Sequence, residues 1–361
     1  WNPWRPFAWA DGNPRGSGSR RSRHLAGPSI AVMAIQLADY GWTGGSPPGD
    51  GRLGRIVRVD RGECDVVTAE GPVRVVSDSQ RAQSETAPAT GDWVLVGTDP
   101  DLGPFVERVL ARTNTLSRRD PSEEVVEQVL VANVDLVLIV HGLDRPLPPG
   151  RLERYLVLAW DSGAEVAVVL TKAGREPEAA AEVSAVVQAV APGVDVLTVE
   201  AGEAAGGIDG VEALIRPGLT VALLGESGAG KSTLVNALVG EEVLATGEVR
   251  SGDRKGRHTT VSRELLLCPT GGLLVDTPGL RSVGLWDAEE ALNRVFGDLE
   301  ELSARCRFAD CVHDTEPDCA VLADGRVAKR RLDRYLSLRR ELADQREREV
   351  ERRRGERGHR R

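Results

Sequence analysis

The chain has few of the features that would place it in a membrane or outside the cell. No apolar run reaches the roughly 18 residues of a membrane-spanning helix. Its five cysteines are too few for a disulfide framework, and three of them cluster near one histidine. An export signal over 25–37 is the alternative, because arginines precede that mildly apolar stretch, but Pro28 and Gln36 interrupt it. We therefore expect a cytoplasmic protein with no membrane partner.

The chain also has no net positive charge, and it has few aromatic side chains. The net charge of −9 excludes a uniformly basic nucleic-acid binder, and aromatic residues make up only 4% of the chain, so base-stacking surfaces are few. Arginine is nevertheless concentrated at the two ends, with four in 15–23 and eight, beside four glutamates, in 346–361. These ends either contact phosphate or are solvated charge runs, and composition leaves both interpretations open.

Methionine occurs once, at Met33, and residue 1 is a tryptophan. We expect translation to start at Met33, which would make residues 1–32 an upstream extension. Residues 1–50 are rich in Gly, Pro and Ser without periodicity, so we expect them to be disordered or loosely attached, with Tyr40 and Trp42 as local anchors.

Residues 51–117 alternate short β-branched runs with Gly, Pro and Asp turns. The runs are Arg55–Val59, Cys64–Thr68, Val73–Val76 and Asp92–Val96. This pattern predicts a small five-stranded barrel of the OB type, which is either an RNA-binding module or a bare scaffold. Trp93 and Phe105 are its obvious stacking residues, so RNA contact would depend mainly on shape and phosphate.

In residues 118–285 the apolar pattern is that of strands alternating with amphipathic helices, which indicates a parallel α/β sheet. The expected strands are Val134–Val140, Glu165–Leu170, Asp195–Val199 and Thr220–Leu224. The expected helices are Arg151–Asp161, Pro177–Val190, a short one near Val211, and Ser232–Val239.

A glycine-rich loop follows the strand that ends at Leu224 and has the spacing of a nucleotide-binding P-loop. The expected nucleotide-binding residues in it are Gly225, Glu226, Ser227, Gly228, Ala229, Gly230, Lys231, Ser232 and Thr233. Its glycines let backbone N–H groups point at a triphosphate, and Lys231 adds a positive charge. We expect Ser232 to ligate Mg²⁺ through its hydroxyl.

Asp276 ends a further buried strand and begins the sequence Asp-Thr-Pro-Gly. We expect Asp276 to hold the same Mg²⁺ and Gly279 to contact nucleotide. Leu280 follows, where Ras-like proteins have a glutamine that orients water.

The polar segment 250–260 supplies His258 as the candidate to position water, the alternative being an ordinary exposed loop histidine. Thr259 and Thr260 are both candidates to close on Mg²⁺ and the γ-phosphate.

A base-reading motif precedes the P-loop instead of following it, so the parts of a GTPase occur in rotated order. The expected base-side residues are Thr171, Lys172, Ala173 and Gly174.

Residues 286–340 contain the ligands of a closed tetrahedral zinc site within a mainly helical domain. The expected ligands are Cys306, Cys311, His313 and Cys319. Such a site folds the domain and leaves no position open for chemistry, so we expect one structural Zn²⁺ per chain; chance clustering or a redox role are the alternatives. Cys64 and Cys268 are expected to be plain buried side chains. A helix is expected over Arg326–Arg354, and a basic tail over 341–361.

Together these motifs resemble the circularly permuted GTPases that depend on the small ribosomal subunit, called RsgA or YjeQ in bacteria. The segments that carry the resemblance, between about Gly51 and Arg340, are Ala132–Asp135, Arg151–Leu156, the P-loop, Gly256–Thr260, Asp276–Gly279 and Cys306–Cys319. The resemblance implies an OB barrel, a permuted GTPase domain and a zinc domain, acting with the 30S subunit and its 16S rRNA in late 30S maturation. It also implies a catalytic role for His258.

Two positions depart from the family pattern. Gly174 stands where the family has an aspartate that reads guanine, and Glu200-Ala201 stands where it tends to have Ser-Ala. Glu176 and Glu200 are conceivable replacements for the missing carboxylate.

The leading interpretation is a monomeric, 30S-activated GTPase that hydrolyses GTP to GDP and phosphate and couples this to its release. The alternative is a ribosome-docking module with a degenerate nucleotide site, which Gly174 favours. A third interpretation, a P-loop ATPase or kinase, is opposed by Thr259-Thr260 and Leu280.

Overall fold

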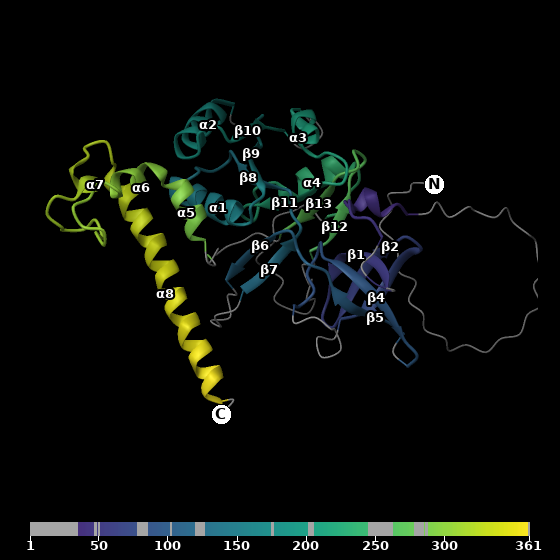
Figure 1. Ribbon diagram of the computed structural model, residues 1–361. Coiled ribbons are helices and arrows are strands. Elements are labelled where there is room, and N and C mark those ends of the chain that lie inside the picture. Colours follow the sequence, from purple (N-terminus) through teal and green to yellow (C-terminus); the bar gives the residue numbers. More distant parts are fainter. Residues whose placement is uncertain are drawn as a thin grey trace, which may run out of the picture.

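The structure is a computed structural model, and its described parts form a β-barrel, an α/β sheet and a helical C-terminal part (Figure 1). The described residues are 35–46, 49, 51–77, 86–101, 103–119, 127–174, 177–200, 206–244, 263–277, 285 and 288–359. The sheet lies between the barrel and the C-terminal helices. This arrangement confirms the fold class predicted from the sequence.

The barrel is closed by five strands in the order β1-β2-β3-β5-β4. They are β1 (Arg52–Val59), β2 (Glu63–Thr68), β3 (Gly71–Val76), β4 (Trp93–Asp99) and β5 (Gly103–Val109). β3 and β5 pair in parallel and the other neighbours are antiparallel. Alternate side chains such as Ile56, Val66 and Val94 fill the interior and are fully buried. Cys64 is among them, which confirms its prediction as a plain buried side chain.

A short 3-10 helix, η1 (Leu37–Tyr40), lies against the outside of the barrel. Trp42, just after it, meets Trp93 edge to face with ring centroids 4.9 Å apart. The described segment 35–46 is therefore attached to the barrel, and Tyr40 and Trp42 are among the residues that anchor it, as expected from the sequence. Its apolar side chains Leu37, Tyr40 and Trp42 pack on Leu53 and Leu95 as well as on Trp93, which gives the segment a cluster of its own.

A two-stranded hairpin connects the barrel to the sheet. Its strands are β6 (Thr115–Arg119) and β7 (Glu127–Ala132). Leu116, Leu130 and Val131 are buried in the core of the α/β part, so the hairpin packs with the sheet and its helices. The expected boundary between residues 117 and 118 falls inside β6.

The central sheet has the strand order β10-β9-β8-β11-β13-β12, and all its neighbours are parallel except the edge pair β12 and β13. The strands are β8 (Leu136–Gly142), β9 (Glu165–Thr171), β10 (Asp195–Thr198), β11 (Thr220–Leu224), β12 (Leu265–Leu267) and β13 (Leu273–Asp276). The strand that leads into the P-loop, β11, thus sits in the middle, between the early strand β8 and the late strand β13.

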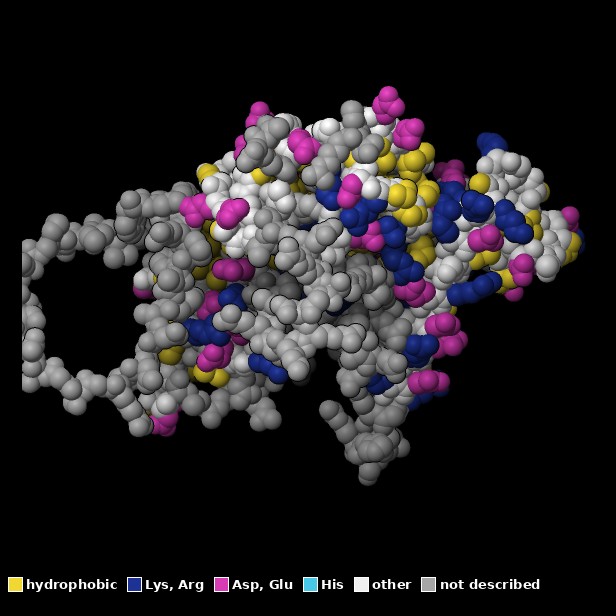
Figure 2. Space-filling view, turned by 180° about the vertical axis from the view of Figure 1, so that it is seen from behind, with side chains coloured by type: hydrophobic (Ala, Val, Ile, Leu, Met, Phe, Trp, Pro, Cys, Tyr) yellow, Lys and Arg dark blue, Asp and Glu magenta, His cyan; other side chains and the backbone are white. Residues whose placement is uncertain are grey.

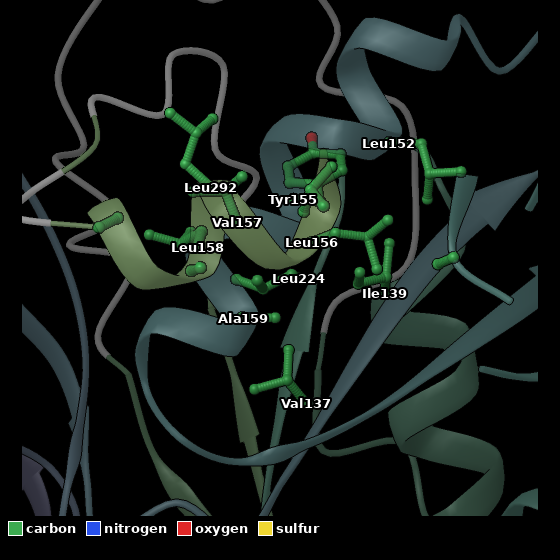
Figure 3. Close-up of a cluster of buried hydrophobic side chains, with 14 of the residues drawn as sticks. Val137, Ile139, Leu152, Tyr155, Leu156, Val157, Leu158, Ala159, Leu224 and Leu292 are labelled. Carbon is green, nitrogen blue, oxygen red and sulfur yellow. The ribbon is translucent and has the colours of Figure 1, made fainter. Parts of the chain in front are cut away.

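Helices cover both faces of this sheet. They are α1 (Pro149–Asp161), α2 (Pro177–Val190), α3 (Ile208–Leu214) and α4 (Lys231–Val239). Along β8, Val137 and Ile139 pack in one core with α1 and α2, while Leu136, Leu138 and Val140 pack in another with α3 and α4. Figure 3 shows the first core, with Leu156 of α1 beside Ile139. This alternation follows from the period of two along a strand.

The C-terminal part consists of the helices α5 (Glu289–Val295), α6 (Gly297–Ser303), α7 (Ala320–Ala323) and α8 (Lys329–His359). Of these, α5 packs against α1 and α8 is joined to α1 by ion pairs. Tyr335 of α8 is fully buried against Phe296, with ring centroids 5.3 Å apart. Residues 341–359 belong to α8, so the expected tail is the second half of a long helix, and Leu342 and Gln345 are still buried there. Figure 2 shows basic and acidic side chains side by side over this helical part.

Candidate nucleotide and metal sites

The loop Gly225–Thr233 connects the end of β11 to the first turn of α4. Gly225 has a φ of 151°, and a Cβ added there would lie 2.3 Å from the carbonyl oxygen of Val140 in β8. Gly230, with a φ of 91°, is the N-cap of α4. Both positions therefore require glycine, and the tight path directs the backbone N–H groups of the loop and of the α4 N-terminus to one place, which is the usual cradle for a phosphate.

Lys231 lies across this loop. Its Nζ donates to the carbonyl oxygens of Gly225 at 2.8 Å and Glu226 at 2.9 Å. Burial lowers the pKa of the ammonium, while the nearby Asp276 and Glu226 carboxylates oppose that shift. A partly desolvated cation at a helix N-terminus interacts more strongly with an anion than a solvated one does.

Asp276 ends β13 beside the P-loop strand, where it is paired in register with Leu223 of β11. Burial raises the pKa of its carboxyl, and Lys231 and a hydrogen bond with Ser232 act in the opposite direction. Within the described part of the chain, Asp276 Oδ1 is buried and has no hydrogen-bond partner. A buried acceptor without a donor, next to a serine hydroxyl, fits the hard oxygen ligands that Mg²⁺ prefers.

The base-side motif lies directly on the P-loop although it precedes the loop in the sequence. Thr171 Oγ1 donates to the carbonyl oxygen of Ala229 at 2.6 Å. Lys172, which has a φ of 63°, donates through Nζ to the carbonyl oxygen of Gly228 at 2.7 Å and to Asp144 Oδ2 at 2.8 Å. The sheet order thus brings together the two segments that were expected to form a nucleotide site. Ala173, half-buried, and Gly174, exposed, continue the same loop.

Gly174 has a close neighbour from the end of β10. Its backbone N–H donates to Glu200 Oε2 at 2.6 Å. Glu200 is itself held by a β-bridge, in which its N–H and carbonyl oxygen bond to Gly206 at 2.9 and 3.1 Å.

Two arginines also contact the P-loop, and sequence reasoning did not assign either to the site. Arg145 Nη1 donates to the carbonyl oxygen of Ser227 at 3.3 Å, and Arg151 Nη1 donates to Glu226 Oε2 at 2.8 Å. Both follow the carboxyl end of β8, which lies next to β11 in the sheet. Because ligands bind at the carboxyl ends of parallel strands, that placement is the signal that could have found them.

The remaining expected nucleotide and catalytic residues, His258, Thr259, Thr260 and Gly279, lie outside the described residues. Thr277, which precedes that last segment, is buried and donates through Oγ1 to the carbonyl oxygen of Leu223.

The expected metal ligands of the C-terminal part converge. One ligand atom from each of Cys306, Cys311, His313 and Cys319 lies within 4.8 Å of the others. The Sγ atoms of Cys306 and Cys319 are 3.8 Å apart, and His313 Nδ1 is 3.7 and 3.4 Å from them. Zn–S bonds of about 2.3 Å in a tetrahedron give an edge of about 3.8 Å, so these spacings fit a zinc ion at the centre.

The orientation of the His313 ring is fixed from its other side. His313 Nε2 lies 2.9 Å from Ser303 Oγ, which donates to the carbonyl oxygen of Leu299 at 2.8 Å. This contact turns Nδ1 toward the three sulfurs, in the way that an outer hydrogen bond usually orients a metal-binding histidine. Ser303 was not predicted from the sequence.

Comparison with known proteins agrees with these features. A "Small ribosomal subunit biogenesis GTPase RsgA" from Streptomyces avermitilis is 47% identical over an alignment of 335 residues, and the match covers 87% of this chain and 87% of that one. The chain belongs to the RsgA GTPase family. The profile of that family matches residues 109–286. A second RsgA, from Streptomyces coelicolor, is 45% identical over 84% of this chain and 86% of its own. The resemblance predicted from the sequence is confirmed.

Solved structures give the same result for the fold. The crystal structure of YjeQ from Thermotoga maritima aligns with a TM-score of 0.55 and 26% identity, covering 81% of this chain and 98% of that one. YloQ, described as a circularly permuted GTPase, aligns with a TM-score of 0.54 at 23% identity, over 81% of this chain and 96% of its own, and at that identity supports the fold alone. Among the helices of the described ranges, none is both long and apolar enough to cross a bilayer.

Proposed function

We propose that this RsgA family member is a GTPase that acts in late maturation of the 30S ribosomal subunit, and that it hydrolyses GTP to GDP and phosphate when docked on the subunit. The observation that carries the proposal is the direct contact of Thr171 and Lys172 with the carbonyl groups of the P-loop. This contact joins a base-side loop to a phosphate cradle, which a P-loop alone does not provide. The cytoplasm, 16S rRNA as a contact and a monomeric state are part of the same proposal.

The residues have separate roles in this proposal. The backbone of Gly225–Thr233 and Lys231 hold the phosphates, and Thr171, Lys172 and Ala173 border the base. Ser232 and Asp276 would hold Mg²⁺, which neutralises phosphate charge when bound. His258 is assigned to position the attacking water, with Thr259 or Thr260 closing on the γ-phosphate and Gly279 beside it. A zinc ion at the three cysteines and His313 would have a structural role only.

The coupling of hydrolysis to release has a physical route through α1. Arg151 in its first turn contacts Glu226 of the P-loop, and Glu153 two residues later contacts α8. We infer that changes at the phosphates are transmitted along this helix to the C-terminal part. The barrel, whose mixed strand order supports the OB type, would supply a second contact to RNA.

The test is GTP turnover by the full chain with and without purified 30S subunits, with 50S subunits and ATP as comparisons. We expect 30S subunits, but not 50S subunits, to stimulate turnover, and we expect turnover of GTP but not of ATP. Lys231→Ala should lower turnover by about 100-fold or more, as for other removed charge-stabilising donors. The exposed Lys329→Ala, at the start of α8, is the matched control for nucleotide binding. Binding of GTP with no 30S-dependent turnover would favour the docking module instead.

Release is tested separately by the affinity of the chain for 30S subunits. We expect tighter binding with a non-hydrolysable GTP analogue than with GDP. Equal affinity in the two nucleotide states would contradict the coupling, whatever the turnover rate.

A further inference from the structure

Gly174 and Glu200 form a contact that places a carboxylate from the end of β10 beside the loop that carries the base-side motif. Glu200 Oε2 accepts the N–H of Gly174 at 2.6 Å. A Cβ added at Gly174 would lie 3.1 Å from that same oxygen and 3.3 Å from the carboxyl carbon. The Glu200 carboxylate therefore lies immediately beside the place where an acidic side chain at position 174 would put its own.

The backbone on both sides of this contact is anchored. Val199 donates its N–H to the carbonyl oxygen of Leu170 at 2.8 Å, which joins the ends of β10 and β9, and Glu200 continues into the β-bridge with Gly206. On the other side, Thr171 and Lys172 are bonded to the P-loop. Glu200 is thus attached to the same edge of the sheet as the phosphate cradle.

We propose that Glu200 reads the base of the bound nucleotide, as the specificity-determining acid of this chain in place of an aspartate at 174. The inference rests on the proposed function and names the residue that makes the site selective for guanine. A carboxylate offers about four lone-pair positions on two oxygens, and the Gly174 N–H uses one of them. Guanine presents two neighbouring donors, N1–H and the 2-amino group, whereas adenine presents an acceptor at N1 and no donor at C2.

The test is a set of nucleotide affinities for the full chain at fixed Mg²⁺, with GDP, IDP, XDP and ADP as ligands. IDP lacks the 2-amino group and XDP has a carbonyl oxygen there. Wild type should prefer GDP to the other three. Glu200→Gln should weaken GDP by about 10-fold to 100-fold, the range for a hydrogen bond to a charged group. The same change should shift the preference toward XDP, because the amide N–H can donate to its 2-carbonyl oxygen.

Further variants test whether Glu200 contacts the base or only joins its own loop to the loop of Gly174. Asp209→Asn removes a nearby exposed acid of α3 and should leave every affinity unchanged. Glu200→Ala should lose guanine preference, and adding Gly174→Asp to it should restore that preference, because the backbone of Gly174 is not in the left-handed region and the carboxylate it would crowd is gone.

An unchanged ratio of GDP to IDP and XDP affinity in Glu200→Gln would overturn the inference. So would a wild-type chain without preference among the four nucleotides. Either result can occur while 30S-stimulated turnover persists, so a failure here is distinguishable from a failure of the proposed function. Conversely, a guanine preference that depends on Glu200 in a chain with no 30S stimulation would support the base contact alone.

Discussion

Arg334 of α8 donates two hydrogen bonds to the buried carboxylate of Glu153 in α1, from Nε to Oε2 at 2.5 Å and from Nη2 to Oε1 at 2.7 Å. Arg331, one turn earlier on α8, adds a third to Oε1 at 3.0 Å. Glu153 has no exposed surface, whereas both arginines are partly exposed. One desolvated acid therefore holds the long C-terminal helix on the helix that also contacts the P-loop.

Replacing Glu153 with alanine should lower the free energy of unfolding by about 2–4 kcal/mol, because Arg334 loses its only carboxylate acceptor among the described residues and Arg331 keeps only Asp298 and the carbonyl oxygen of Val295. Urea unfolding followed by circular dichroism measures the change. The control is Glu289→Ala, which removes the surface pair with Arg346, where both side chains are about half exposed. That variant should cost less than about 1 kcal/mol. Equal costs for the two variants would contradict the importance we assign to burial.

Cys319→Ser should remove zinc from the chain and lower its thermal stability, since a structural metal contributes its binding free energy to folding. Metal analysis of the purified chain should give one zinc per wild-type molecule and much less in the variant. Cys268→Ser is the matched control, because Cys268 is buried in the sheet domain outside the ligand cluster and its prediction as a plain buried side chain is confirmed. A variant that keeps full zinc occupancy would rule out the assignment of Cys319.

Asp276→Asn should have opposite effects on stability and on activity. Burial raises the pKa of the Asp276 carboxyl, so the charged form is less favourable in the folded chain than in the unfolded one near neutral pH. The amide should therefore stabilise the nucleotide-free chain, while Mg²⁺-dependent GTP turnover falls by about 100-fold or more. Thermal unfolding and turnover assays measure the two effects, and Asp101→Asn, on the exposed rim of the barrel, should change neither. A loss of stability in Asp276→Asn would argue against the desolvated carboxylate.

Stability should fall as the pH drops from 7.5 to 5.5, partly because of His141. Burial lowers the pKa of its imidazole below 6.5, and the ring Nε2 lies 3.0 Å from the carbonyl oxygen of Arg145. The unfolded chain then binds a proton at a higher pH than the folded chain does, so this contribution is intact above pH 6.5 and is lost as the pH falls toward the folded pKa. His141→Gln should reduce the fall, as measured by urea unfolding at the two pH values. The same pH dependence in both proteins would exclude His141 as a source.

The elements that depend on local pattern could be predicted from the sequence. The strand Thr220–Leu224 and the helix Pro177–Val190 have the predicted bounds. The apolar periodicity of each segment and the turn residues next to it are both visible in the local sequence. The cluster of three cysteines and one histidine was predicted for a similar reason, since its four members are close in the chain. Spacing of this kind is visible without knowledge of the fold.

Contacts between distant segments could not be predicted in this way. Glu200 meets Gly174, and Arg145 meets Ser227, only because the sheet order brings the ends of different strands together. The helix was predicted over Arg326–Arg354, but its second half was also assigned to a basic tail because charge dominates its composition. Composition does not show that Leu342 has a surface to pack against.

The central position of β11 also governs the order in which the chain can fold during synthesis. The barrel strands emerge first and can close among themselves, because all five precede the sheet in the chain. β8, β9 and β10 emerge next as half a sheet, and the edge of β8 that β11 will pair with stays open until residues 220–224 have been made. Open edges of apolar strands are sites of misassembly. From this order of strands we expect an intermediate with an open β8 edge during synthesis, and we expect nucleotide to stabilise the chain only after β13 has been added.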